Sequence, residues 1–93
     1  NTVLIKISDV YDEYDTFTVA LIDRYGFKYE KSVSDVKKAG RTEIKNILQS
    51  DFRRRAGKYV QIRAEDGTIF IHLHWIKERK MDFYISLTGM MKH

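Results

Sequence analysis

A run of lysines and arginines in the middle of the chain has the residue types that bind phosphate. It consists of Lys37, Lys38, Arg41, Lys45, Arg53, Arg54, Arg55 and Lys58. Clustered cations bind a polyanion by neutralising its charge and releasing counterions, and the planar arginine fork matches phosphate geometry. We name this set the basic segment and interpret it as a nucleic-acid contact. The alternative is a set of solvated cations, in which the arginines favour a helix C-terminus and pair with nearby carboxylates.

The charge is distributed unevenly along the chain. Residues 1–30 carry three basic and six acidic side chains, a net charge of −3, whereas residues 31–58 carry nine basic and three acidic side chains, a net charge of +6. Residues 59–93 carry five basic and four acidic side chains, and the whole chain has a formal net charge of +4. Such asymmetry indicates a surface that faces a polyanion.

A second group of side chains alternates along the expected C-terminal strands and would share one side of a sheet. We call this group the aromatic sheet face; it consists of Tyr59, Gln61, Arg63, Phe70, His72, His74, Tyr84 and Ser86. Exposed aromatic rings can stack on unpaired bases while arginine holds the backbone. The other interpretation is that this side packs against the rest of the protein, which the apolar Phe70 and Ile76 on the same side favour.

His72 and His74 point to the same side of an expected strand, and neutral imidazole is a good metal ligand. A site would need a third ligand, for which the candidates are Asp82, Tyr84 and His93. The chain has no HExxH motif and no cysteine. We therefore expect a structural or surface role for the two histidines and no bound metal.

An acidic stretch, residues 9–15, carries Asp9, Asp12, Glu13 and Asp15. Its spacing superficially resembles a calcium loop, but the glycine at the sixth position and the glutamate at the twelfth are missing. A row of carboxylates could also mimic phosphate and occupy the nucleic-acid groove of a partner protein. The simpler expectation is a solvated loop between two strands.

Residues for covalent catalysis are scarce. The chain has no cysteine, and none of its serines lies in a nucleophile motif or beside a recognisable histidine pattern. Its five glycines are isolated, so no glycine-rich phosphate loop is present. We therefore expect a non-enzymatic protein without a cofactor. No apolar run approaches the roughly 20 residues of a membrane span, and we expect a cytoplasmic protein.

Hydrophobic periodicity predicts the elements that position these residues. Period-two alternation predicts strands over residues 2–8, 16–22, 27–33, 58–64, 68–76 and 82–88. Between them, Ile44, Ile47, Leu48 and Phe52 follow helical spacing, which predicts one main helix over about residues 42–56 with Thr42 as its N-cap. A short helical turn is expected within residues 34–40, starting at the Ser34-Asp35 pair.

The strand order predicts an α+β fold in one domain, residues 1–93. The simplest architecture is a mostly antiparallel sheet, curved or barrel-like, with β-β-β-α-β-β-β order and the main helix covering one face. The first three strands would form a meander, and Asp66-Gly67 predicts a hairpin. Residues 68–76 and 82–88 would pair so that Trp75 faces Phe83 and Leu73 faces Ile85 on the buried side. A register shifted by two residues, in which Leu73 faces Phe83, fits the same alternation.

Two functions from different classes follow. The first is a small nucleic-acid-binding protein that contacts the phosphates of DNA or RNA through the basic segment. The second is an interaction or inhibitor module that blocks a host or defence protein, because the composition is similar to that of phage and mobile-element accessory proteins. A homodimer formed through an uncovered sheet edge is a third expectation.

Overall fold

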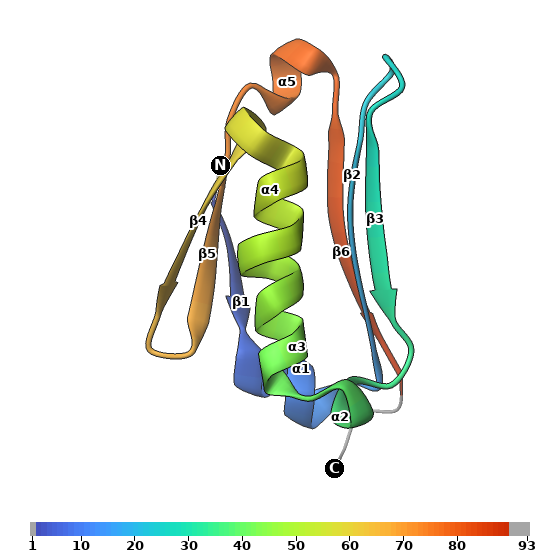
Figure 1. Cartoon of the computed structure of the whole chain (residues 1–93), viewed down its shortest axis with the longest axis vertical. Coiled ribbons are helices and arrows are strands. Elements are labelled where there is room, and N and C mark those ends of the chain that lie inside the picture. The colour runs from blue at the N-terminus through green and yellow to red at the C-terminus, as the bar shows by residue number, and fades with distance from the viewer. Residues whose placement is uncertain (1, 90–93) are drawn as a thin grey trace.

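The computed structural model describes residues 2–89 and has strands on both sides of one central helix (Figure 1). Six strands form two separate three-stranded antiparallel sheets, ordered β1-β5-β4 and β3-β2-β6. The strands are β1 Thr2–Lys6, β2 Thr16–Ile22, β3 Lys28–Val33, β4 Val60–Glu65, β5 Thr68–Leu73 and β6 Asp82–Thr88. The predicted α+β class is confirmed, with three strands before the helix and three after it. The described strands do not close into a barrel.

The central helix runs from residue 41 to residue 56, close to its predicted bounds. It consists of α3 (Arg41–Asn46), a π-helical stretch (η1, Ile47–Phe52) and α4 (Arg53–Ala56). Its predicted apolar stripe is confirmed, because Ile44, Ile47, Leu48 and Phe52 are all buried. The predicted cap is wrong: Gly40 precedes the first turn with a φ of 89°, and Thr42 lies inside the helix.

One hydrophobic core fills the space between the helix and both sheets. Phe17, Val19 and Leu21 of β2 are fully buried, as are Ile69 and Ile71 of β5. Each such side chain stabilises the fold by roughly 1.5–3 kcal/mol relative to leaving it exposed. The two sheets therefore hold the helix in place from opposite sides.

The acidic stretch is a helix and not the predicted loop. Residues Ile7–Glu13 form α1, and the first strand ends at Lys6 rather than at residue 8. Ile7 and Val10 are buried one helical turn apart and anchor α1 to the core. The predicted turn within residues 34–40 is confirmed as α2 (Val36–Ala39), whose first turn is capped by Asp35 accepting the Lys38 amide at 3.1 Å.

The predicted strand pairing is partly wrong. The β4–β5 hairpin at Asp66-Gly67 and the β2–β3 hairpin are confirmed. However, β1 pairs with β5 rather than β2, so the first three strands are not a meander. Likewise β6 pairs with β2, where Leu21 faces Phe83, and not with β5. Long-range pairing places the first strand, β1, and the last strand, β6, in different sheets.

Trp75 explains why β5 and β6 do not form a hairpin. Its backbone is left-handed, with φ 54° and ψ 18°, so β5 ends at Leu73 instead of running to residue 76. The short helix α5 (Ile76–Arg79) then carries the chain across to the other sheet (Figure 1). Trp75 is 55% exposed and does not face Phe83 in the core. None of the helices within residues 2–89 has both the length and the apolarity needed to cross a membrane.

Candidate nucleic-acid interface

The central helix places the two halves of the basic segment at opposite ends of the molecule. Figure 1 shows α1 and α2 beside the first turn of the helix. Its last turn leads into a 3-10 turn (η2, Gly57–Tyr59) next to α5 (Figure 1). The Tyr59 ring centre lies 6.3 Å from that of Phe27 in the β2–β3 turn. The eight cations, which are close in sequence, therefore do not form one surface.

One end of the molecule is strongly cationic. Three segments meet there, residues 23–28, 53–58 and 75–80, and together they carry nine basic and two acidic side chains, a net charge of +7. We call this the basic end. It contains Arg53, Arg54, Arg55 and Lys58 of the basic segment, together with cations of residues 23–28 and 75–80 that lie outside that segment.

The opposite end has an excess of carboxylates. Residues 6–15, 34–45 and 65–67 carry five basic and eight acidic side chains, a net charge of −3. We call this the acidic end. Ile7 donates its amide to the Gly67 carbonyl at 3.0 Å, and Val36 donates its amide to the Asp15 carbonyl at 2.9 Å, so these segments are bonded to one another.

The other four cations of the basic segment lie at the acidic end. Arg41 forms an ion pair with Asp12 at 3.8 Å, and its guanidinium lies 4.9 Å from the centre of the Tyr11 ring. Lys45 lines a hollow that it shares with Lys6, Arg41 and Asp66. Lys37 and Lys38 are exposed on α2. The nearby carboxylates lower the attraction of these four cations for a polyanion.

At the basic end, Arg53 lines a groove that extends from the end of the central helix over β4. We call this the β4 groove; it has a volume of about 730 Å³. Its lining residues are Arg53, Gly57, Val60, Gln61, Ile62, Arg63 and His72. Two arginines and a histidine thus share one hollow whose lining includes no carboxylate. Glu65 lies outside it and pairs with Arg63 at 3.4 Å, with both side chains 59% exposed.

Arg54, the next residue, faces the other side of the helix. We call that hollow the β3 groove; it is lined by Lys31, Glu43, Asn46, Ile47, Ser50, Asp51 and Arg54. Asp51 accepts hydrogen bonds from Arg54 at 3.2 Å and from the Tyr29 hydroxyl at 3.0 Å. Burial and this bond to Asp51 raise the pKa of Tyr29. The β3 groove therefore has an internal anion for its arginine.

The residues of the aromatic sheet face do not all share one face, so that prediction is partly wrong. Arg63, Phe70, His72 and Gln61 share the outer face of the first sheet, where Arg63 faces Phe70 and Gln61 faces His72. The Arg63 guanidinium lies 4.4 Å from the centre of the Phe70 ring. The other members lie elsewhere: Tyr84 and Ser86 on β6 in the second sheet, Tyr59 in η2 and His74 after the end of β5.

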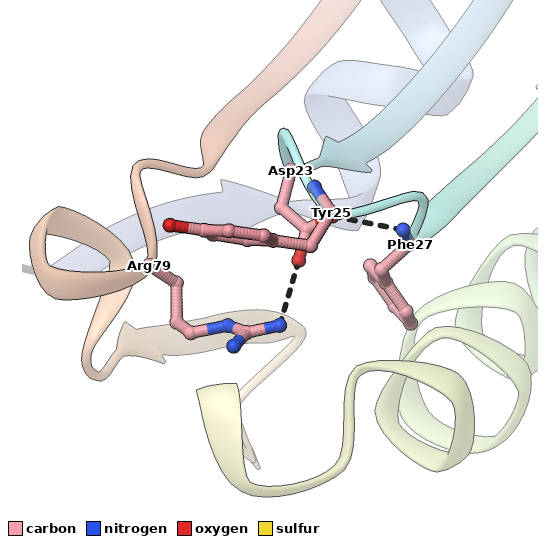
Figure 2. A network of polar contacts seen from close by, with 4 residues as sticks. All are labelled: Asp23, Tyr25, Phe27 and Arg79. Atoms are coloured by element: carbon pink, nitrogen blue, oxygen red, sulfur yellow. Dashed lines mark hydrogen bonds and ion pairs between the residues drawn. The ribbon is translucent and has the colours of Figure 1, made fainter.

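A buried carboxylate holds the basic end together, as Figure 2 shows. The side chain of Asp23 is fully buried and accepts the amides of Tyr25 and Phe27 at 2.9 and 2.8 Å. It also accepts a hydrogen bond from Arg79 of α5 at 3.1 Å. Burial alone would raise the pKa of Asp23, but the two amides and the Arg79 guanidinium together hold it below its ordinary value.

Aromatic rings surround Arg79 at the same place. Its guanidinium lies 4.8 Å from the Tyr25 ring centre and 5.8 Å from that of Tyr59. Figure 2 shows the Tyr25 ring lying flat beside this guanidinium. Tyr25 is nevertheless 66% exposed. Asp23 and Arg79 are 56 residues apart, and no local pattern in the sequence indicates that they meet.

Neither Asp82 nor Tyr84, the two described candidates for a third metal ligand, lies in the sheet that holds His72. His72 contacts the Thr2 hydroxyl through Nδ1 at 3.0 Å. Asp82 and Tyr84 face Ile22 and Ala20 in the other sheet, and His93 lies outside the described residues. Within residues 2–89, no three histidine or carboxylate side chains are placed to hold a metal ion.

Known proteins add nothing to this geometry. A scan against protein-family models and searches of curated proteins and of solved structures find no match to this chain.

Proposed function

We propose that this protein binds nucleic acid without catalysing a reaction, and that the phosphates lie in the β4 groove at the basic end. The observation that carries the proposal is that Arg53 and Arg63 line one hollow with no carboxylate in its lining. Arg53 comes from the central helix and Arg63 from β4, so the fold brings together two cations that are ten residues apart in sequence.

The charge of the whole basic end supports the same conclusion. Its net charge of +7 exceeds that of the entire chain, which is +4. A polyanion gains most of its non-specific affinity from such a field through released counterions. The carboxylates at the acidic end would repel the same ligand, so the field also orients the protein on it.

Two variants that each remove three positive charges test the proposal. Arg53→Ala/Arg54→Ala/Arg55→Ala removes three charges from the basic end, and Lys37→Ala/Lys38→Ala/Arg41→Ala removes three from the acidic end. Binding of a labelled oligonucleotide is followed by fluorescence anisotropy across salt concentrations. We expect the first variant to lower the slope of log K against log salt by up to about 2–3, because each lost phosphate contact contributes roughly 0.7–0.9.

The acidic-end variant is the control, and we expect its slope to change by less than about 1. All six side chains are exposed, so both variants should keep the circular dichroism spectrum of the wild type. Equal slopes for the wild type and the basic-end variant would contradict the proposal.

The alternative is a protein-interaction module, and the free edges of β3 and β4 favour it. These strands flank the central helix, and in the described part of the chain each pairs with a single strand. An extended segment of a partner, or of a second copy, could add to such an edge. A pull-down from nuclease-treated lysate tests for the partner, and light scattering tests for the homodimer.

A further inference from the structure

The exposure of Trp75 is not explained by the proposed binding of phosphates. Trp75 is the only tryptophan in the chain, and it is 55% exposed. Its φ of 54° is a conformation that bulky side chains rarely adopt. This backbone turns the ring away from the core, where the hydrophobic pattern alone would place it.

The ring borders a small hollow at the basic end. Its volume is about 300 Å³, at the small end of the range for ligand sites, and it is lined by Lys58, Tyr59, Trp75, Glu78 and Arg79. We call it the Trp75 hollow. Two aromatic rings, two cations and one carboxylate therefore surround one space. The Lys58 amine lies 5.8 Å from the centre of the Tyr59 ring, so that ring already packs against a cation.

The two hollows of the basic end suit different parts of a nucleotide. The β4 groove offers arginines without a lining carboxylate, which suits phosphate. In the Trp75 hollow, Glu78 would repel phosphate but can accept a hydrogen bond from a base N–H, including the ring N3–H of thymine. The exposed indole offers a flat apolar surface on which any base can stack.

The chain itself connects the two hollows. Gly57 lines the β4 groove and Lys58, the next residue, lines the Trp75 hollow. The His74 amide also donates to the Tyr59 carbonyl at 2.7 Å, which fixes the start of the α5 connection against η2. A strand whose phosphates lie in the groove thus has the hollow directly beside it.

We propose that the Trp75 hollow takes one unpaired base of a single-stranded nucleic acid whose phosphates lie in the β4 groove. This inference rests on the nucleic-acid binding proposed above and names its substrate class. A duplex keeps its bases stacked on one another, so it cannot offer a base to the indole. The protein therefore prefers a single strand to a duplex of equal charge.

Trp75 fluorescence tests the proposal, because its emission has no contribution from another tryptophan. The protein is titrated with oligothymidylate, with a DNA duplex and with heparin, a polyanion that has no bases. We expect oligothymidylate to quench the emission and heparin to bind without quenching it. The variant Trp75→Asn should bind oligothymidylate roughly 5- to 100-fold more weakly, the loss of one stacked base, and heparin as well as the wild type does.

Asparagine is chosen because it tolerates a positive φ, so the turn into α5 should survive the substitution. Trp75→Phe keeps a ring and should recover most of the affinity. Tyr84→Ala removes an aromatic ring that is 42% exposed on the other sheet and should bind like the wild type.

The outcomes separate this inference from the proposed function. If oligothymidylate binds without quenching Trp75, and if Trp75→Asn binds it as tightly as the wild type does, then the stacking site is overturned. The proposed phosphate binding would remain. No binding of either oligothymidylate or heparin at low salt overturns both and favours a protein partner. A duplex that binds as tightly as the single strand and quenches equally also overturns the inference.

Discussion

The basic end and the acidic end of this molecule are held together by different interactions. At the basic end, one buried carboxylate joins the β2–β3 turn to α5 through Asp23 and Arg79. At the acidic end, the ion pair between Asp12 and Arg41 is long, at 3.8 Å, and both side chains are more than half exposed. Exposed pairs of this kind contribute little. Packing and backbone hydrogen bonds therefore hold the acidic end, whereas a polar network joins α5 and its Arg79 to the β2–β3 turn at the basic end.

Among the substitutions that compare the basic end with the acidic end, we expect Asp23→Ala to cause the largest loss of stability. The substitution leaves the Tyr25 and Phe27 amides without their acceptor and removes the partner of Arg79. A broken buried network is one of the few causes of large destabilisation, and we expect the Tm to fall by about 10 °C. Calorimetry measures it. A Tm within about 2 °C of the wild type would show that the network does not stabilise the basic end.

Gly89→Ala should give the next largest loss of stability, because Gly89 lies against Asp15 of the acidic end. Gly89 has a φ of 129°, and a Cβ there would lie 2.7 Å from the Asp15 Cβ. Strain and overpacking together should cost roughly 1–3 kcal/mol in the free energy of unfolding. Urea denaturation checks this, with Gly67→Ala as a control in which a Cβ meets no atom within 4 Å although φ is also positive. If the two variants lose equal stability, the clash with Asp15 contributes nothing.

Acid should loosen the basic end through Asp23. Its pKa is lower in the folded protein than the ordinary value of about 3.9, so the unfolded chain takes up the proton first as the pH falls. The stability from this group is present above about pH 4 and is lost as the pH falls through the folded-state pKa. We expect the difference in Tm between the wild type and Asp23→Asn to shrink below about pH 4.

The asparagine variant is a suitable reference because its amide oxygen can still accept the two backbone amides. A difference in Tm that stays constant from pH 7 to pH 2 would contradict the pKa assigned to Asp23.

The smallest effect should come from Arg41→Ala. Its pair with Asp12 is exposed, so we expect a change in the free energy of unfolding of about 0–1 kcal/mol. Urea denaturation measures this, and Asp12→Ala should give a change of the same size. A loss above about 2 kcal/mol would mean that the acidic end depends on this ion pair.

Local patterns predicted much of the fold. The stripe from Ile44 to Phe52 identified the central helix, alternation identified β2, and Asp66-Gly67 identified a hairpin. Each depends on residues that are close in sequence. Helix α1 was missed although Ile7, Val10, Tyr11 and Tyr14 follow helical spacing, because the carboxylates between them suggested a loop.

Strand partners and the candidate site could not be predicted in the same way. Several registers between two strands satisfy the same alternation, so the pattern did not show that β6 belongs beside β2. The left-handed backbone at Trp75 could not be predicted, because the position holds neither glycine nor asparagine, the residues that usually adopt a positive φ. The sequence identified the cations, but only the fold separates Lys37 and Lys38 from Arg53 and brings Arg79 of α5 beside Tyr59 of η2.

The central claim is that anions bind at the basic end and not along the whole basic segment. Backbone amide NMR spectra recorded during a titration with heparin test this residue by residue. We predict shifts in residues 23–28, 53–63 and 75–80, with residues 6–15 and 34–45 unchanged. Shifts of equal size at Lys37, Lys38 and Arg41 would contradict the account.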